Sequence, residues 1–169
     1  MIYNSFFSAD EVTLLKSNVD TEINKRVLSQ DDHFPYSSYN INQACGRKVA
    51  SFINIDESLK LKIYNEILKN YSTASLMNVV YAQYSNQYGV PLLEMHQDGH
   101  VDANSKTICF DYQLESNTSW DLIVGNQNYS MSDNDAVLFD SSNEMHGRPN
   151  KTFADGEFIT NLFFFFNVI

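Results

Sequence analysis

His96, Asp98 and the distant His146 are the residues of this chain whose types and spacing could bind a metal. Two imidazoles and one carboxylate are the ligands of a facial Fe(II) site, which leaves the opposite face of the ion open for a substrate, a cosubstrate or O₂. Residues two apart in an extended segment point to the same side, so His96 and Asp98 can reach one ion from a strand end. We therefore predict a metal site that His146 completes from a strand packed opposite.

The second half of the chain carries the patterns that predict the strands needed to hold these ligands. Short segments rich in Val, Ile, Phe and Tyr follow one another and are separated by Gly, Asn and Asp turns. These candidate strands span residues 76–85, 90–96, 106–114, 120–124, 129–131, 136–140 and 158–168. The last of them contains four consecutive phenylalanines, which are typical of a strand buried on both faces.

Two helices are predicted before the strands. Ser8 and Glu11 have the spacing of a capping box, and a helical apolar stripe follows them. Asp56 begins a second segment of this kind. Residues 29–46 are polar and irregular, which indicates a loop with a short strand near residues 39–41. Helices followed by about eight short strands predict an antiparallel sandwich or open barrel with the helices packed on one sheet.

Composition and charge restrict the class of protein. The 169 residues are 43% hydrophobic and 14% aromatic, which is enough for one globular domain with a β-rich core. The formal net charge of −10 argues against a duplex-DNA binder, which needs a basic face for the phosphates. A modest basic cluster is formed by Arg47, Lys48, Lys60 and Lys62.

The expected compartment is the cytoplasm. Cys45 and Cys109 have neither a disulfide pattern nor metal-type spacing, so we interpret them as free thiols in a reducing environment. The first residues lack the basic start and apolar run of a secretory signal. No apolar run reaches the length of a transmembrane helix, so no membrane partner is expected.

The order of the motifs along the chain resembles that of the Fe(II)/2-oxoglutarate-dependent oxygenases and, among them, the prolyl 4-hydroxylase-like group. The resemblance covers about residues 79–166. Its parts are the strand and turn at 81–89, the His-x-Asp at 96–98, the strand 107–114 with its Tyr-x-Leu ending, the segment 134–139, and the distal His146. A bare His-x-Asp is a weak motif, and the ordered set carries more weight.

The resemblance implies a fold and a reaction. The fold is α+β and mostly β, with a double-stranded β-helix (jelly-roll, cupin-like) core and N-terminal helices packed on one sheet. Within a single domain of residues 1–169, residues 1–74 would form a helical support region and residues 75–169 the jelly-roll catalytic core. The reaction is hydroxylation of an unactivated C–H bond by a dioxygenase that uses Fe(II), 2-oxoglutarate and O₂, with ascorbate as a candidate reductant.

The resemblance to prolyl hydroxylases favours a peptide or protein side chain as substrate over a free amino acid or other small molecule. The acidic charge would suit a basic peptide or a small cationic molecule. Nucleic acid ranks last for the same reason. The sequence leaves the oligomeric state open.

The family usually places an Arg or Lys about ten residues after the distal His, on the last core strand, where it pairs with the far carboxylate of 2-oxoglutarate. Residues 155–161 of this chain contain no cation. Arg148 is the preferred candidate, because a planar guanidinium can bind a carboxylate bidentately and because it lies two residues from His146. Lys151 is the alternative.

Further contacts are expected around the metal. Hydroxyl donors to the cosubstrate are implied at Tyr84, Tyr112 and Thr160. Substrate contacts are expected from the loops at 29–45 and 99–104. The candidates there are His100, Tyr36 and Tyr39.

Two other classes of protein remain open. A non-catalytic, cupin-like module could keep a divalent ion or another ligand, and the missing cation on the last strand favours it. A metal-dependent isomerase or dioxygenase of the cupin type usually needs three or more His ligands. The chain has four histidines, and His33 and His100 are poorly placed to join the other two.

Overall fold

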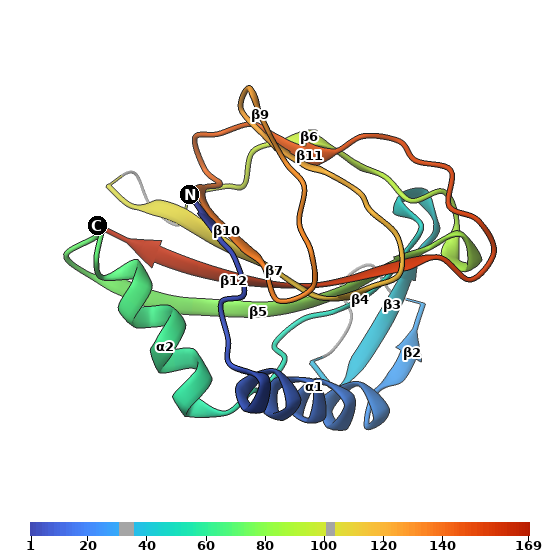
Figure 1. Cartoon of the computed structure of the whole chain (residues 1–169), viewed down its shortest axis with the longest axis horizontal. Helices are drawn as coiled ribbons and strands as arrows, with labels where there is room; N and C mark the ends of the chain where they lie inside the picture. The colour runs from blue at the N-terminus through green and yellow to red at the C-terminus, as the bar shows by residue number, and fades with distance from the viewer. Residues whose placement is uncertain (31–35, 101–103) are drawn as a thin grey trace.

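Two β-sheets face each other in the computed structural model, and two helices cover the outer side of the larger sheet (Figure 1). The structure describes residues 1–30, 36–100 and 104–169. Mostly antiparallel sheets in this layered arrangement confirm the predicted mostly β, jelly-roll architecture with helices on one sheet. Among the described residues, no helix is long and apolar enough to span a membrane.

Neighbouring strands in the two sheets often come from distant parts of the sequence, and their lengths differ widely. The larger sheet consists, in spatial order, of β1 (Ile2–Tyr3), β10 (Ala136–Asp140), β7 (Lys106–Ser116), β12 (Phe158–Val168), β5 (Ala74–Ser85), β4 (Arg47–Ala50), β3 (Ser38–Asn42) and β2 (Val27–Ser29). The smaller sheet consists of β6 (Leu93–His96), β11 (His146–Arg148), β8 (Leu122–Val124) and β9 (Gln127–Tyr129). Two 3₁₀ turns, η1 (Gln43–Cys45) and η2 (Asn86–Tyr88), connect strands.

The helices begin where the sequence predicts. Helix α1 (Ala9–Asn24) follows a complete capping box, in which the Ser8 backbone N–H donates to Glu11 Oε2 at 2.7 Å and the Glu11 N–H donates to Ser8 Oγ at 3.3 Å. Helix α2 (Glu57–Ile67) is capped by Asp56, which accepts a hydrogen bond from the Ser58 N–H at 2.8 Å.

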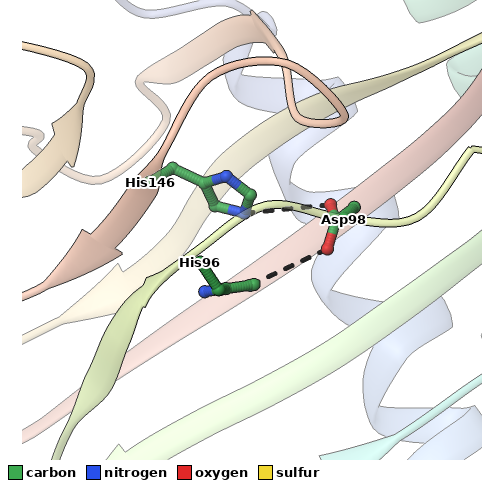
Figure 2. Close-up of side chains that lie close together, drawn as sticks. All are labelled: His96, Asp98 and His146. Carbon is green, nitrogen blue, oxygen red and sulfur yellow. Dashed lines mark ion pairs between the residues drawn. The ribbon is translucent and has the colours of Figure 1, made fainter.

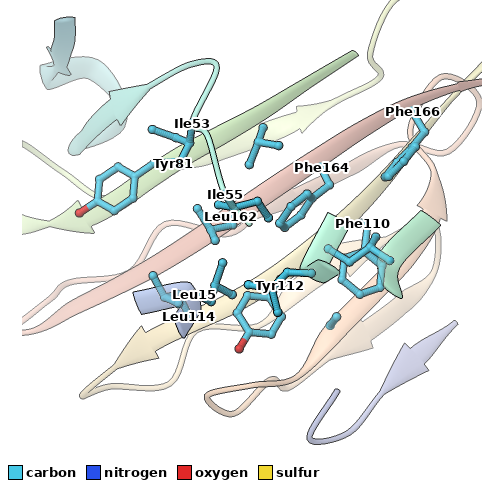
Figure 3. Close-up of a cluster of buried hydrophobic side chains, with 14 of the residues drawn as sticks. Leu15, Ile53, Ile55, Tyr81, Phe110, Tyr112, Leu114, Leu162, Phe164 and Phe166 are labelled. Carbon is cyan, nitrogen blue, oxygen red and sulfur yellow. The ribbon is translucent and has the colours of Figure 1, made fainter. Parts of the chain in front are cut away.

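Strand alternation divides the larger sheet into an outer face toward the helices and an inner face toward the smaller sheet. On β12, Leu162, Phe164 and Phe166 point outward into the main apolar cluster, which also contains Leu15 of α1 and Leu59 of α2 (Figure 3). Their neighbours Ile159 and Phe163 point inward, against residues of the smaller sheet. The last strand is therefore buried on both faces, as its phenylalanines predict.

The region predicted to be helical support also contributes to the larger sheet. It supplies β1, β2, β3 and β4, of which the sequence analysis assigned only a short strand near residues 39–41. These strands have two to five residues and pair with each other or with remote strands, so they carry little local signal. They extend the inner face of the sheet well beyond the jelly-roll core (Figure 1).

Candidate metal centre

His96, Asp98 and His146 are brought together by two neighbouring strands of the smaller sheet (Figure 2). β11 pairs with β6 in an antiparallel register that places His146 opposite His96. The two ring centroids lie 4.3 Å apart. Asp98 follows β6 by two residues, so its side chain turns to the same side as His96. The prediction that these residues converge is thus confirmed in the geometry.

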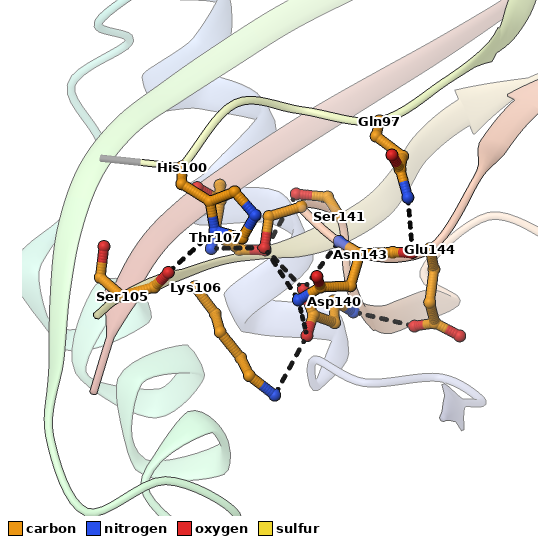
Figure 4. Close-up of polar contacts among 10 residues, drawn as sticks. Gln97, His100, Ser105, Lys106, Thr107, Asp140, Ser141, Asn143 and Glu144 are labelled. Carbon is orange, nitrogen blue, oxygen red and sulfur yellow. Dashed lines mark hydrogen bonds and ion pairs between the residues drawn. The ribbon is translucent and has the colours of Figure 1, made fainter. Parts of the chain in front are cut away.

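A polar network fixes the segment that carries Asp98 (Figure 4). The Asp98 N–H donates to the Ser141 carbonyl at 2.7 Å, and Gln97 Nε2 donates to the Asn143 carbonyl at 2.6 Å. Asn143 is in turn held by both oxygens of Asp140, at the end of β10. The turn after β10 therefore acts as a support that positions the carboxylate between the two histidines.

The three side chains leave room for an ion between them. His96 Nε2 lies 3.7 Å from Asp98 Oδ1, and His146 Nε2 lies 3.8 Å from Asp98 Oδ2. These distances are too long for hydrogen bonds. All three donor atoms lie within 4.8 Å of one another, so a single cation can reach all of them.

Both histidines present an unprotonated Nε2 to this space. His96 Nδ1 lies 2.7 Å from the Glu94 carbonyl and His146 Nδ1 lies 3.0 Å from the Glu144 carbonyl. A carbonyl oxygen only accepts, so each Nδ1 carries the proton and each Nε2 lone pair is free for a metal. Burial also lowers the pKa of His146, which keeps its imidazole neutral near pH 7.

The carboxylate supplies a further sign that a cation belongs here. Asp98 Oδ2 is buried and has no hydrogen-bond partner among the described residues. A buried carboxylate oxygen without a donor costs free energy, and a bound cation removes that cost. Neutral imidazoles and one carboxylate are the donor set that Fe(II) accepts. The residues present therefore fit an Fe(II) ion.

A cavity of about 890 Å³ lies between the sheets, and the three side chains form part of its wall. This volume is in the range of small-molecule binding sites. Leu122, Phe139 and Phe163 give it apolar walls near the metal ligands. Asp111 and Arg47 are its charged residues apart from the metal ligands.

Arg148, the predicted cosubstrate contact, is fully buried beside the cavity and already has partners. Its Nη2 lies 3.2 Å from Asp111 Oδ2, and its Nη1 donates to the Trp120 carbonyl. The other Asp111 oxygen accepts from Asn161 Nδ2 at 2.6 Å. Burial raises the pKa of Asp111 although Arg148 opposes the shift. The charge of Arg148 is therefore matched by Asp111, and its side chain does not line the cavity.

Arg47, which the sequence analysis did not assign to the site, does line the cavity. It begins β4, and its Nη1 donates to the Tyr84 hydroxyl at 3.1 Å. Its Nε is buried without an acceptor, and in the described part of the chain no carboxylate forms an ion pair with it. Tyr84, a predicted hydroxyl donor to the cosubstrate, lies on the inner face, does not line the cavity, and accepts the hydrogen bond from Arg47.

Tyr112 and Thr160 lie on the outer face of the sheet, away from the metal ligands, which corrects the expectation that they face the cosubstrate. The Tyr112 hydroxyl donates to Asn134 Oδ1 at 3.1 Å, within the cluster that packs under the helices. Thr160 Oγ1 accepts from Gln83 Nε2 at 3.3 Å. Successive strand residues point to opposite faces, and on these strands Asp111 and Asn161 point inward instead.

This placement makes a direct prediction. Changing Tyr112 to Phe should remove one hydrogen bond and lower the free energy of unfolding by about 1 kcal/mol, without changing the affinity for 2-oxoglutarate. Chemical denaturation and a ligand titration on the same sample measure the two quantities. A selective loss of 2-oxoglutarate affinity with unchanged stability would contradict the placement.

The other expected contacts lie around the cavity rather than in it. His100 is exposed, and its Nδ1 lies 2.9 Å from the Ser105 carbonyl (Figure 4). Tyr36 is exposed and contacts Phe52, with ring centroids 4.0 Å apart and the ring planes inclined by 47°. Tyr39 points to the outer face under Lys48. Lys151 Nζ donates to Thr118 Oγ1 at 2.6 Å, and His33 lies outside the described residues.

The region of the predicted substrate loop does reach the cavity, through different residues. Gln30, Asn42 and Gln43 line it from the side of β2 and β3. The extended part of the larger sheet thus gives the cavity a polar end, opposite the apolar walls near the metal ligands.

No protein-family model matches the sequence, and no curated protein matches it. Solved structures do match over nearly the whole chain. One is the viral collagen prolyl hydroxylase of Paramecium Bursaria Chlorella virus-1 in its 2-oxoglutarate complex, with a TM-score of 0.63, 10% identity, and coverage of 100% of this chain and 95% of that chain.

Two further structures are similar to the same extent. A Trichoplax adhaerens prolyl hydroxylase in complex with a peptide of the hypoxia inducible factor oxygen degradation domain has a TM-score of 0.62 and 16% identity, and covers 98% of this chain and 82% of its own. HygX of Streptomyces hygroscopicus, with nickel, 2-oxoglutarate and hygromycin B bound, has a TM-score of 0.67 and 10% identity, and covers 99% and 82%. The chain has the fold of the Fe(II)- and 2-oxoglutarate-dependent oxygenases. The similarity extends over the N-terminal half of the chain as well, beyond the span of the motifs.

Proposed function

We propose that this chain is an Fe(II)- and 2-oxoglutarate-dependent dioxygenase that hydroxylates an unactivated C–H bond. The observation that carries the proposal is the convergence of two unprotonated imidazole nitrogens on the Asp98 carboxylate, one oxygen of which is buried without a hydrogen-bond donor among the described residues. The residues that would hold Fe(II) are His96, Asp98 and His146. The oxygenase fold of the solved structures supports the same reading.

Each part of the chain has a defined task in this reaction. Bound Fe(II), with a 2-oxo acid and O₂, supplies the oxidising chemistry, which protein side chains cannot provide. The Glu94 and Glu144 carbonyls hold the two imidazoles in the tautomer that binds a metal. Leu122, Phe139 and Phe163 form an apolar wall against which the carbon chain of a substrate can pack.

A peptide or protein side chain is the substrate class we favour. The cavity has a polar end where β3 runs into η1, and there Asn42 and Gln43 can hydrogen-bond to an extended backbone. Two of the similar structures are prolyl hydroxylases, one of them with a bound peptide. The net charge of −10 favours a basic segment. Mass spectrometry of peptide mixtures incubated with the loaded protein tests this, because the substrate gains one oxygen atom.

An anaerobic visible spectrum tests the function without a known substrate. The apo-protein is loaded with Fe(II) and then given 2-oxoglutarate, and a weak charge-transfer band appears only when the 2-oxo acid chelates the protein-bound iron. We expect the band in the wild-type protein and not in His96→Ala. His100→Ala is the matched control, because this exposed histidine does not line the cavity and should keep the band.

The alternative is the non-catalytic, cupin-like module, which the pairing of Arg148 with Asp111 favours because that arginine is not free. Iron that binds to the wild-type protein without any band on addition of 2-oxoglutarate would support this alternative. Absence of iron binding in the wild-type protein would overturn the proposed function and the metal-binding form of the alternative, and would leave a module for another ligand.

A further inference from the structure

Within residues 1–30, 36–100 and 104–169, Arg47 is the cation lining the cavity that has no ion-pair partner. Of the two arginines near the metal ligands, Arg148 is paired with Asp111 at 3.2 Å. The Nε of each arginine is buried without an acceptor, so the two differ in their counter-ion: Arg47 donates to the Tyr84 hydroxyl and forms no ion pair among the described residues. A guanidinium that lines a cavity and has no counter-ion among the described residues can bind an anion, and a carboxylate matches its planar fork.

The position of Arg47 is fixed by the fold. β4 pairs with β5 in a register that sets Arg47 opposite Tyr84, so both side chains lie on the inner face. Gly46 precedes it at a φ of +54°, and a Cβ there would lie 2.5 Å from the backbone of Val90 and Pro91. This close approach packs the start of β4 against the segment that leads into β6. Trp120 packs edge-on against Tyr84, with ring centroids 5.0 Å apart.

Charge balance identifies the anion. Fe(II) with the Asp98 carboxylate leaves one positive charge, and 2-oxoglutarate brings two negative charges. The Arg148–Asp111 pair adds none, so the loaded cavity would keep one negative charge without a further cation. Arg47 lines the same cavity and neutralises it. Protein walls solvate a charge less well than bulk water does, so a bound anion is stabilised by an opposite charge close by.

We infer that Arg47 binds the far carboxylate of 2-oxoglutarate and takes the place of the cation that the resembling family carries on its last core strand. The inference rests on the proposed function. It moves the cosubstrate contact from β12 to β4, which lies outside the span of the sequence resemblance. Asn161, on the inner face of β12, donates its amide to Asp111 instead.

A comparison of two ligands tests the inference. 2-Oxopentanoate has the chain length and the chelating end of 2-oxoglutarate but lacks its far carboxylate. We expect Arg47→Met to weaken 2-oxoglutarate binding to the anaerobic Fe(II) protein about 10- to 100-fold, as for loss of a charge-assisted pair. The affinity for 2-oxopentanoate should be unchanged. Dissociation constants from the charge-transfer band and from calorimetry give both numbers without turnover.

Matched variants make the result specific. Lys48→Met changes the next residue of β4, whose side chain lies on the outer face over Tyr39, and should leave both affinities unchanged. Arg47→Lys keeps the charge without the planar fork, so its affinity for 2-oxoglutarate should fall less than that of Arg47→Met. The Lys variant also serves as the test if the Met variant folds poorly. The paired change Arg148→Met with Asp111→Asn should keep the preference for 2-oxoglutarate.

The outcomes separate the two proposals. Equal effects of Arg47→Met on the two ligands, or no effect on either, overturn the inference while the proposed function stands. The inference is also overturned if the Arg148→Met, Asp111→Asn protein loses the preference for 2-oxoglutarate over 2-oxopentanoate while Arg47→Met keeps it. That result assigns the contact to Arg148. If neither ligand chelates iron in the wild-type protein, the proposed function fails and the inference fails with it.

Discussion

Replacing Gly147 by Ala should weaken Fe(II) binding by about 100-fold, the upper end of the range for a change in residues that support metal ligands. Gly147 lies between His146 and Arg148 in β11, where the strand runs against β6. A Cβ at this position would lie 2.6 Å from the Leu93 carbonyl oxygen and 2.9 Å from that of Glu94. These are backbone atoms of the strand that carries His96, so no side-chain rotation can relieve the overlap.

The two strands must therefore move apart, and His96 and His146 move with them. The Glu94 carbonyl also holds His96 Nδ1, so the same overlap disturbs the orientation of that ring. The accompanying loss of stability should be about 1–3 kcal/mol, as for other overpacked sites.

Calorimetric titration with Fe(II) under argon measures the affinity. Gly99→Ala is the matched control, since a Cβ there meets nothing within 4 Å although it directly follows Asp98. Wild-type affinity in Gly147→Ala would contradict the prediction.

The features that the sequence predicted well depend on local spacing. Ser8 and Glu11 form the capping box because both partners lie within one turn of helix. His96 and Asp98 face one side because they lie two residues apart along an extended segment. His146 joins them through one pairing between β6 and β11, and the order of the motifs indicated that pairing.

The features that were missed depend on which residues of a strand buried on both faces point toward the metal. Asp111 and Tyr112 are neighbours in β7 and both are buried, so hydrophobicity does not tell which of them points to the metal. The tyrosine was favoured by its matching position, whereas the useful signal was the charged residue inside an apolar strand. Arg47 escaped notice because β4 has four residues and acquires its place only by pairing with β5.

Replacing Arg148 by Met should lower the free energy of unfolding by about 3–5 kcal/mol at neutral pH, the usual cost of removing one partner from a buried ion pair. Both side chains of the pair are fully inaccessible to solvent. The guanidinium also donates to the Trp120 carbonyl and lies 5.5 Å from the centre of the indole ring. Without it, the Asp111 carboxylate would remain buried with the Asn161 amide as its hydrogen-bond donor.

The loss should depend on pH in a way that identifies its cause. Burial already raises the pKa of Asp111 above its ordinary value of 3.8, and Arg148 opposes this shift, so the pKa must rise further in the variant. A raised pKa means that the folded form holds a proton that the unfolded form releases, so stability falls as the pH rises above that of the unfolded carboxyl. The variant should therefore lose less stability near pH 4 than near pH 7, as measured by urea denaturation at both values.

Adding Asp111→Asn removes the unpaired charge and should recover a large part of the stability and abolish its extra pH dependence. An equal loss at both pH values would show that packing around Trp120, rather than the uncompensated carboxylate, is what Arg148 contributes.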